Sequence, residues 1–351
     1  MNFGIWSNGW RPHTSPQWAY EEDLKEIILA DELGMRDAWV SEHHAEPVYV
    51  GKVDVLPAPD LLMCKAAALT KRIRFGAAVK VIHLMHPVDS ALQAATAAHV
   101  IGDGRYIFGF GSGFPNPLFS EERGMSDELR RERTAEALEL ILKCWAQEEP
   151  FDWDGRFWSG RNITVLPKPP ADMPIATATF SPDSLKVAGE RGYIALTAGS
   201  PAVMRKNAIT YLQAAEGAGH ENPIENLVAT ASIYVADSEA EGIEDLRAGV
   251  EYELSFHRER GLLKMMGANL GMDDVTFDSL VAAGQYVIGD PDSVYERLEA
   301  LYEESGGFGT LLYRCGKGWA DPSKIETSMR RFTAEVAPRL SKLTPTLTAA
   351  G

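Results

Sequence analysis

Strand-like and helical segments alternate along almost the whole of this 351-residue chain, and this alternation restricts the fold more than any other feature. The helical segments carry apolar residues at steps of three or four, as in Leu24, Ile27 and Ala30 before the helix-ending Gly34. Strands that are separated by helices in this way pair in parallel. The sequence therefore predicts an α/β fold.

The number of strand–helix units predicts how the sheet closes. Eight such units favour a barrel over an open sheet, so we expect a (β/α)8 TIM barrel with insertions. The strands are expected at residues 3–6, 38–40, 73–82, 105–110, 174–178, 193–197, 227–235 and 309–313. Helices are expected around 24–33, at 61–69, 90–100 and 126–145, from Pro182, Pro201 and Glu239, and near 324–336.

The domain organisation follows from this alternation. We expect one barrel domain over residues 1–340 and a disordered tail at 341–351. An irregular stretch at 151–170, rich in Trp, Gly and Pro, is interpreted as an excursion from the sheet.

A second insertion is expected at 255–284, between the helix that begins at Glu239 and the last strand. It is longer than a barrel connection needs. Its methionines at 265, 266 and 272, beside Gly267 and Gly271, suit a mobile lid over a ligand. The alternative is an ordinary extra helix on the barrel rim.

Composition restricts the partners and the compartment. The net charge is −16 and the sequence pI is about 5.0, without runs of Lys or Arg, so nucleic acid and anionic membranes are not expected partners. The three cysteines, Cys64, Cys144 and Cys315, form neither a disulfide framework nor a zinc motif. No secretory signal or membrane-length apolar run is evident. We therefore expect a cytoplasmic protein with reduced thiols.

Residues 102–114 place a short apolar strand between two clusters of glycine. At the end of this strand, Gly109, Gly111 and Gly113 leave the backbone bare, which lets a flat or phosphorylated ligand approach closely. The alternative is that these glycines serve only turns and tight packing.

Histidines follow a neighbouring strand, where Glu42, His43 and His44 stand together. Adjacent residues at a strand end point to opposite sides, so one imidazole faces the barrel mouth and would act there as a general acid or base. Two alternatives are a metal site, formed by Glu42, one of these histidines and His83 or His86, and histidines that only stabilise the fold.

A helix start at residues 180–184 suggests a phosphate site. Ser181 is expected to cap the helix, Pro182 to take its first position and Ser184 to lie in its first turn. Together with the open Ser112–Gly113 turn, the free amides here would bind a phosphate. The alternative is a plain helix cap.

These segments together resemble the flavin-dependent luciferase-like monooxygenases, the bacterial luciferase superfamily. The resemblance covers nearly the whole chain, and its specificity comes from the order and spacing of short motifs. The motifs are residues 2–5, 38–44 (AWVSEHH), 70–76 (TKRIRFG), 86–88 (HPV), 102–106 (GDGRY) to Gly113, 181–184 (SPDS) and 288–291 (IGDP).

The resemblance implies a barrel whose carboxyl face binds reduced FMN, supplied by a separate NAD(P)H-dependent flavin reductase. Molecular oxygen (O2) then adds to the flavin, and the resulting peroxyflavin oxygenates a small organic substrate. A homodimer without a bound metal is expected.

The resemblance also implies site residues. By position, His43 is the acid/base residue beside the flavin. The Ala78–Val79 bond matches the family's non-prolyl cis peptide, which supports the flavin ring. Phosphate-site positions fall on Ser112, Ser181 and Ser184. The remaining expected cofactor-binding residues are Gly111, Gly113 and Phe180.

Two positions depart from bacterial luciferase. Gly111 stands where that enzyme has a reactive Cys facing the flavin, and Ser112 stands where it has a phosphate-binding Arg. Loss of this cation weakens the expected phosphate site and puts the flavin type in question. Luminescent aldehyde oxidation is not implied.

Other chemistries fit the same fold. A related branch uses a reduced deazaflavin for hydride transfer, and a non-catalytic flavin-binding protein is a third alternative. The Glu-His-His sequence favours oxygenation, because that reaction needs a positioned proton donor. The expected substrate pocket is apolar or aromatic and contains Trp6, Trp10, His44, Phe114 and Trp319.

Overall fold

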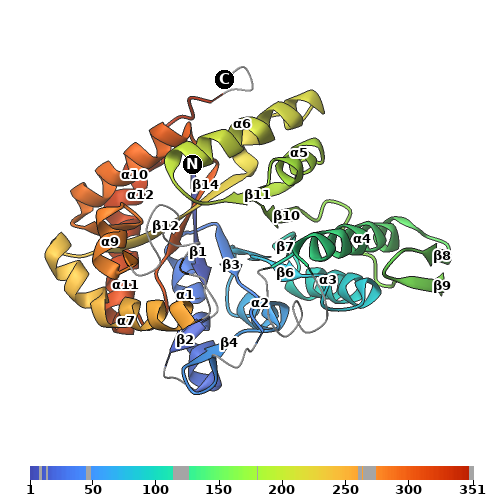
Figure 1. The fold of residues 1–351 in the computed structure, drawn as a ribbon, viewed down its shortest axis with the longest axis horizontal. Helices are drawn as coiled ribbons and strands as arrows, with labels where there is room; N and C mark the ends of the chain where they lie inside the picture. The colour runs from blue at the N-terminus through green and yellow to red at the C-terminus, as the bar shows by residue number, and fades with distance from the viewer. Residues whose placement is uncertain are drawn as a thin grey trace.

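Eight parallel strands form a closed barrel, as predicted, in the computed structural model (Figure 1). Each strand pairs with the next around the ring, and the ring closes between β10 and β7. The strands are, in ring order, β1 (Asn2–Ser7), β3 (Asp37–Val40), β5 (Arg74–Ala77), β7 (Tyr106–Gly111), β10 (Ile175–Ala178), β11 (Ile194–Thr197), β12 (Leu227–Val235) and β14 (Thr310–Arg314). The structure describes residues 1–7, 10–12, 15–44, 49–113, 126–179, 181–259, 263 and 274–347.

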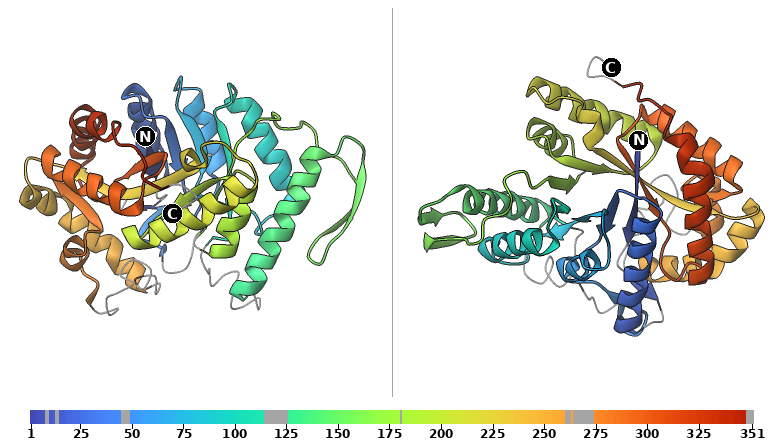
Figure 2. Two further views of the ribbon diagram at one scale, coloured as in Figure 1. Left: turned by 90° about the horizontal axis from the view of Figure 1, so that it is seen from above. Right: turned by 180° about the vertical axis from the view of Figure 1, so that it is seen from behind.

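Helices surround the strands (Figures 1 and 2). Many begin with a proline that follows a capping Ser or Asp, because proline suits the first helical position and the cap accepts a free backbone N–H. They are α1 (Pro16–Glu32), α2 (Pro59–Ala67), α3 (Pro87–Ile101), α4 (Asp127–Ala146), α5 (Pro182–Glu190), α6 (Pro201–Gly217), α7 (Glu239–Glu259), α9 (Phe277–Ala282), α10 (Pro291–Ser305), α11 (Pro322–Arg331) and α12 (Ala337–Leu340), with a π-helical turn at Phe332–Val336. Within the described ranges, no helix combines the length and the apolar character needed to cross a membrane.

Two small antiparallel sheets lie outside the barrel. β2 (Trp10–Pro12) pairs with β4 (Val53–Val55). β8 (Phe151–Asp154) and β9 (Ser159–Ile163) form a hairpin beyond α4, which agrees with the excursion expected at 151–170 (Figures 1 and 2).

The strand predicted at 73–82 is two strands, β5 and β6 (Lys80–Val81), so that part of the prediction was wrong. The extended conformation is interrupted between β5 and β6 by a cis peptide bond that joins Ala78 and Val79. Both strands pair with β7.

The connection before the last strand also differs from the prediction. After 255–284 the chain forms β13 (Tyr286–Gly289), which pairs with the carboxyl half of β12, and then α10, before it reaches β14. The sequence interpretation did not predict β13, which pairs with β12 outside the ring of eight strands. The methionines proposed for a lid, with residues 260–262 and 264–273, lie outside the described residues.

The chain after residue 340 packs against the domain as far as it is described, whereas a disordered tail was expected. Leu347 is buried, and the N–H groups of Thr346 and Leu347 both donate to the carbonyl of Gly306 at 3.0 Å. Residues 348–351 lie outside the described part of the chain.

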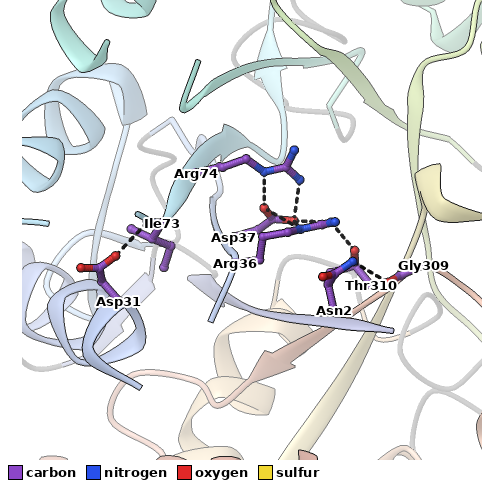
Figure 3. Close-up of polar contacts among 8 residues, drawn as sticks. All are labelled: Asn2, Asp31, Arg36, Asp37, Ile73, Arg74, Gly309 and Thr310. Atoms are coloured by element: carbon purple, nitrogen blue, oxygen red, sulfur yellow. Dashed lines mark hydrogen bonds and ion pairs between the residues drawn. The ribbon is translucent and has the colours of Figure 1, made fainter. Parts of the chain in front are cut away.

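Side chains that point inward fill the barrel in levels. At its amino end, Asp37 pairs with Arg36 and Arg74 (Figure 3). Above them the fully buried Trp39 packs among apolar side chains of the other strands, and the partly buried Trp6 and Ala78 border this cluster toward the carboxyl ends. The barrel is therefore a packed core, and the carboxyl ends of the strands are where a ligand site belongs.

The TKRIRFG motif has a structural role at the start of β5. The carboxylate of Asp31 on α1 accepts the backbone N–H groups of Lys71, Arg72 and Ile73 at 2.8 to 3.0 Å (Figure 3 draws the bond to Ile73). Burial alone would raise the pKa of Asp31, but these three bonds outweigh it and the pKa is lowered. Asp31 thus fixes the register with which this strand enters the barrel.

Candidate active site

The floor of the barrel mouth is largely apolar. Trp6 at the end of β1, Ala78 after β5 and Ala178 at the end of β10 are partly buried against the apolar cluster inside the barrel. The indole N–H of Trp6 donates to Ser41 Oγ at 2.9 Å, which fixes the ring over that cluster. The predicted pocket residue Trp6 therefore lies at the mouth.

The glycines of β7 are required by strand packing. A Cβ on Gly109 would strike the carbonyl oxygen of Ala77, and one on Gly111 would lie 2.6 Å from Val79 Cγ2. Gly113 has φ +61°, and its Cβ would lie 3.0 Å from the Val81 side chain. Tight packing therefore accounts for the three glycines, while close approach of a ligand to their backbone stays a prediction.

This packing explains one departure from bacterial luciferase. A cysteine at position 111 would collide with Val79, which belongs to the cis Ala78–Val79 peptide. The cis bond itself, which the resemblance implied, is confirmed. A side chain at 111 and Val79 in this conformation are thus mutually exclusive.

Glu42 and His44 form a polar pair beside this cis segment. His44 Nε2 lies 2.9 Å from Glu42 Oε1, and the same oxygen accepts the N–H of Val81 at 3.3 Å. Glu42 therefore ties the end of β3 to the start of β6 and orients the His44 ring. His44 remains partly exposed.

His43 occupies a different environment, as expected for adjacent residues at a strand end. Its ring stacks on Trp10 with centroids 4.0 Å apart and planes 20° apart, and its backbone N–H donates to Leu56 O at 2.9 Å. Trp10 is itself 4.7 Å from the His257 ring, edge to face. The imidazole of His43 is thus held in place, and its role toward a flavin stays a prediction.

The other two histidines proposed for the mouth have structural partners. His83 is buried against Thr134, with 3.3 Å between Nδ1 and Oγ1. Burial, followed by the charges of Arg130 and Arg133, lowers the pKa of His83 to about 4. His86 caps α3 by accepting the N–H of Val88 at 3.3 Å. Within the described ranges, no group of three or more His, Cys, Asp or Glu side chains could hold a metal ion.

Polar groups that suit a phosphate meet at the ends of β7 and β10. Ser181 caps α5 as predicted, accepting the N–H of Ser184 at 3.3 Å and donating to its hydroxyl at 2.8 Å. Both serines reach the surface. Phe180 and Phe114, which were assigned to the cofactor and substrate sites, lie outside the described residues.

Arg130 is a cation that the sequence interpretation missed. It lies on α4, and its Nη1 donates to the carbonyl of Gly113 at 3.0 Å, next to Ser112. Its other partner is the exposed Asp127 at 3.2 Å. No sequence signal places it here, because residues 114–125 separate α4 from β7. Arg130 brings a guanidinium to the turn where Ser112 replaces the arginine of bacterial luciferase.

Trp319 lies deeper than a pocket residue was expected to lie. Only 2% of it is exposed, and its indole N–H donates to Glu253 Oε2 at 2.6 Å. The ring also lies 5.1 Å from the Arg314 guanidinium. Trp319 therefore packs against Arg314, the last residue of β14.

Comparison with known proteins agrees with this arrangement. The model of a protein family described as "Luciferase-like monooxygenase" matches residues 1–308. The chain is similar to 3,6-diketocamphane 1,6-monooxygenase of Pseudomonas putida, with 25% identity over 94% of this chain and 95% of that protein. It is also similar to limonene 1,2-monooxygenase of Rhodococcus erythropolis, with 27% identity over 97% and 87% of the two chains.

Solved structures share the fold. The oxygenating constituent of 3,6-diketocamphane monooxygenase, a type II Baeyer-Villiger monooxygenase solved with FMN, superposes with a TM-score of 0.80 at 24% identity and 99% coverage of both chains. An F420-dependent secondary alcohol dehydrogenase superposes with a TM-score of 0.74 at 19% identity, covering 96% of this chain and 98% of that one.

Proposed function

Because the chain belongs to the luciferase-like monooxygenase family, we propose that it is the oxygenase component of a two-component system that takes reduced FMN from a separate flavin reductase. The chain is a flavin-dependent monooxygenase. The observation that carries the finer proposal is the similarity over nearly the full length to the diketocamphane monooxygenase component, which was solved with FMN.

The residues at the mouth fit FMN. Ser181 and Ser184, with the free amides that begin α5, would hold the phosphate on one side, and Arg130 would supply the positive charge on the other. Ala78 and Ala178 carry side chains small enough to leave a flat surface over the barrel core. A planar ring system suits this surface.

The protein and the flavin would divide the chemistry between them. When bound, reduced FMN would supply the electrons that activate molecular oxygen. Trp6 would cover one side of the reacting region and exclude water from it. His43, held against Trp10, would hold and deliver the proton that the oxygenation requires.

The substrate is an open part of the proposal. The names of the two relatives contain diketocamphane, which carries carbonyl groups, and limonene, which carries none. The residues of this chain that line the mouth must decide which kind it accepts.

Isotopically labelled oxygen tests the proposed reaction. Protein supplied with reduced FMN and labelled oxygen should place one labelled atom in the product, as measured by mass spectrometry over a panel of small organic compounds. His43→Ala should keep FMN binding and lose product formation by about 10²-fold or more. Hydride transfer from a reduced deazaflavin without oxygen uptake would contradict the proposal, and equal affinity for FMN and riboflavin would contradict the phosphate site.

A further inference from the structure

Arg314 is a cation at the barrel mouth, and the proposed reaction assigns it no role. It is the last residue of β14, in register with Ser232 of β12. Leu312, two residues earlier, points into the barrel core, so the alternation of the strand directs Arg314 to the same side, at the mouth. It is partly buried, close to the ring of Trp6.

The guanidinium of Arg314 is held on three sides. Its Cζ lies 5.6 Å from the Trp6 ring centroid and 5.1 Å from that of Trp319. Nε and Nη2 both donate to Ser232 Oγ, at 3.1 and 2.5 Å. Two indoles and one hydroxyl thus fix the plane of the group before any ligand arrives, which reduces the entropy lost on binding.

Part of the donor capacity of Arg314 is not used by the residues that the structure describes. A guanidinium has five N–H groups, and the hydrogen bonds above involve only Nε and Nη2. In the part of the chain that the structure describes, no carboxylate lies within ion-pair distance of Arg314. The buried carboxylate of Glu253 interacts electrostatically with Arg314, while its close partners are Trp319, from which it accepts at 2.6 Å, and His257 Nε2 at 3.5 Å.

The topology separates Arg314 from the proposed phosphate site. The phosphate-binding groups stand at the ends of β7 and β10, whereas β14 lies between β12 and β1, three or more strands away around the ring in either direction. Ser112 and Ser181 therefore mark one side of the mouth and Arg314 the other. A ligand group that binds Arg314 would therefore lie on the side of the mouth away from the phosphate.

We propose that Arg314 binds a carbonyl oxygen of the substrate and so selects ketones over hydrocarbons of the same shape. A neutral carbonyl fits better than a carboxylate, because the buried carboxylate of Glu253 already interacts electrostatically with Arg314 and the chain carries a net charge of −16. Arg314 is a substrate-binding residue in this proposal, and Ser232, Trp6 and Trp319 position it. The inference rests on the proposed monooxygenase function.

Matched compounds test the selection. Camphor with bornane, and cyclohexanone with cyclohexane, differ by one carbonyl, and cyclohexanecarboxylate adds the anion. In the wild type, the ketones should give product and lower the release of hydrogen peroxide, whereas the hydrocarbons should do neither.

In Arg314→Met the KM for the ketone should rise about tenfold or more, which is the scale of one lost charge-assisted hydrogen bond. The affinity for the ketone, measured by calorimetry with oxidised FMN present, should weaken by the same factor. Arg314→Lys should recover part of the loss.

Control measurements separate this inference from the proposed function. Arg339→Met removes a guanidinium that lies 3.8 Å from the Tyr295 ring on the outer surface, and it should leave the KM unchanged. Anaerobic binding of reduced FMN by the wild type is measured separately from the response to ketones. Its absence would reject the proposed use of reduced FMN and would leave the role of Arg314 without its premise.

Four results would overturn the role of Arg314 while the monooxygenase stands. The wild type could respond equally to ketone and hydrocarbon, respond to no ketone, or prefer the carboxylate. Arg314→Met could lose affinity for FMN in place of affinity for the ketone.

Discussion

At the scale of single residues, His83 shows how burial converts a histidine into a source of acid sensitivity. Its pKa falls to about 4 in the folded protein from an ordinary value of 6.5, because it is desolvated and lies near Arg130 and Arg133. Below pH 6.5 the unfolded chain therefore binds a proton that the folded chain does not. The contribution of His83 to stability is complete above pH 6.5 and is lost as the pH falls toward 4.

We expect His83→Gln to reduce the dependence of the free energy of unfolding on pH. Between pH 6.5 and 4 the free energy of unfolding of the wild type should fall about 1–3 kcal/mol further than that of the variant. Urea denaturation followed by circular dichroism at several pH values across the window measures the difference. His99→Gln, at an exposed position on α3, is the matched control and should keep the wild-type slope. Parallel curves for wild type and His83→Gln would show that His83 titrates normally.

At the scale of elements, β7 packs tightly against the segment from β5 to β6. We expect Gly111→Ala to lower the free energy of unfolding by about 1–3 kcal/mol, because its Cβ would lie 2.6 Å from Val79 Cγ2. Adding Val79→Ala should recover most of this loss, which a double-mutant cycle in urea measures. Gly217→Ala, whose Cβ meets nothing within 4 Å, should cost nothing. Additive losses in the double mutant would exclude this contact as the cause.

At the scale of the whole molecule, exposed apolar side chains at α2 and α3 indicate a partner surface. Leu61 on α2 and Leu69, just after the end of that helix, are 74% and 53% exposed, and Val100 near the end of neighbouring α3 is 63% exposed (Figure 1). We propose that a second copy of the chain covers them. The wild type should then be a dimer in light scattering, and Leu61→Glu with Leu69→Glu should be a monomer. Val187→Glu with Val203→Glu, on α5 and α6, should leave it unchanged. A monomeric wild type would refute the proposal.

The sequence predicted the barrel because its strong signals are repeated. Alternating strands and helices with Ser-Pro or Asp-Pro helix starts identified all eight barrel strands and the cap at Ser181. The short β13 and the break at Ala78–Val79 depend on tertiary pairing with β12 and β7, and local periodicity carries no sign of them. Arg130 was not recognised as a site residue because only the folded chain shows where its guanidinium group lies.

The ion pairs around Asp37 give the barrel a closed lower end. Asp37, Trp39 and Thr310 are each at most 1% exposed, so in the described part of the chain the amino end of the barrel is closed and ligands would enter at the carboxyl end. Flavin, oxygen, substrate and product would then all enter and leave at the carboxyl end of the barrel. The ligand that binds deeper must bind first and dissociate last, so the closed amino end imposes an order of binding without a separate mobile element.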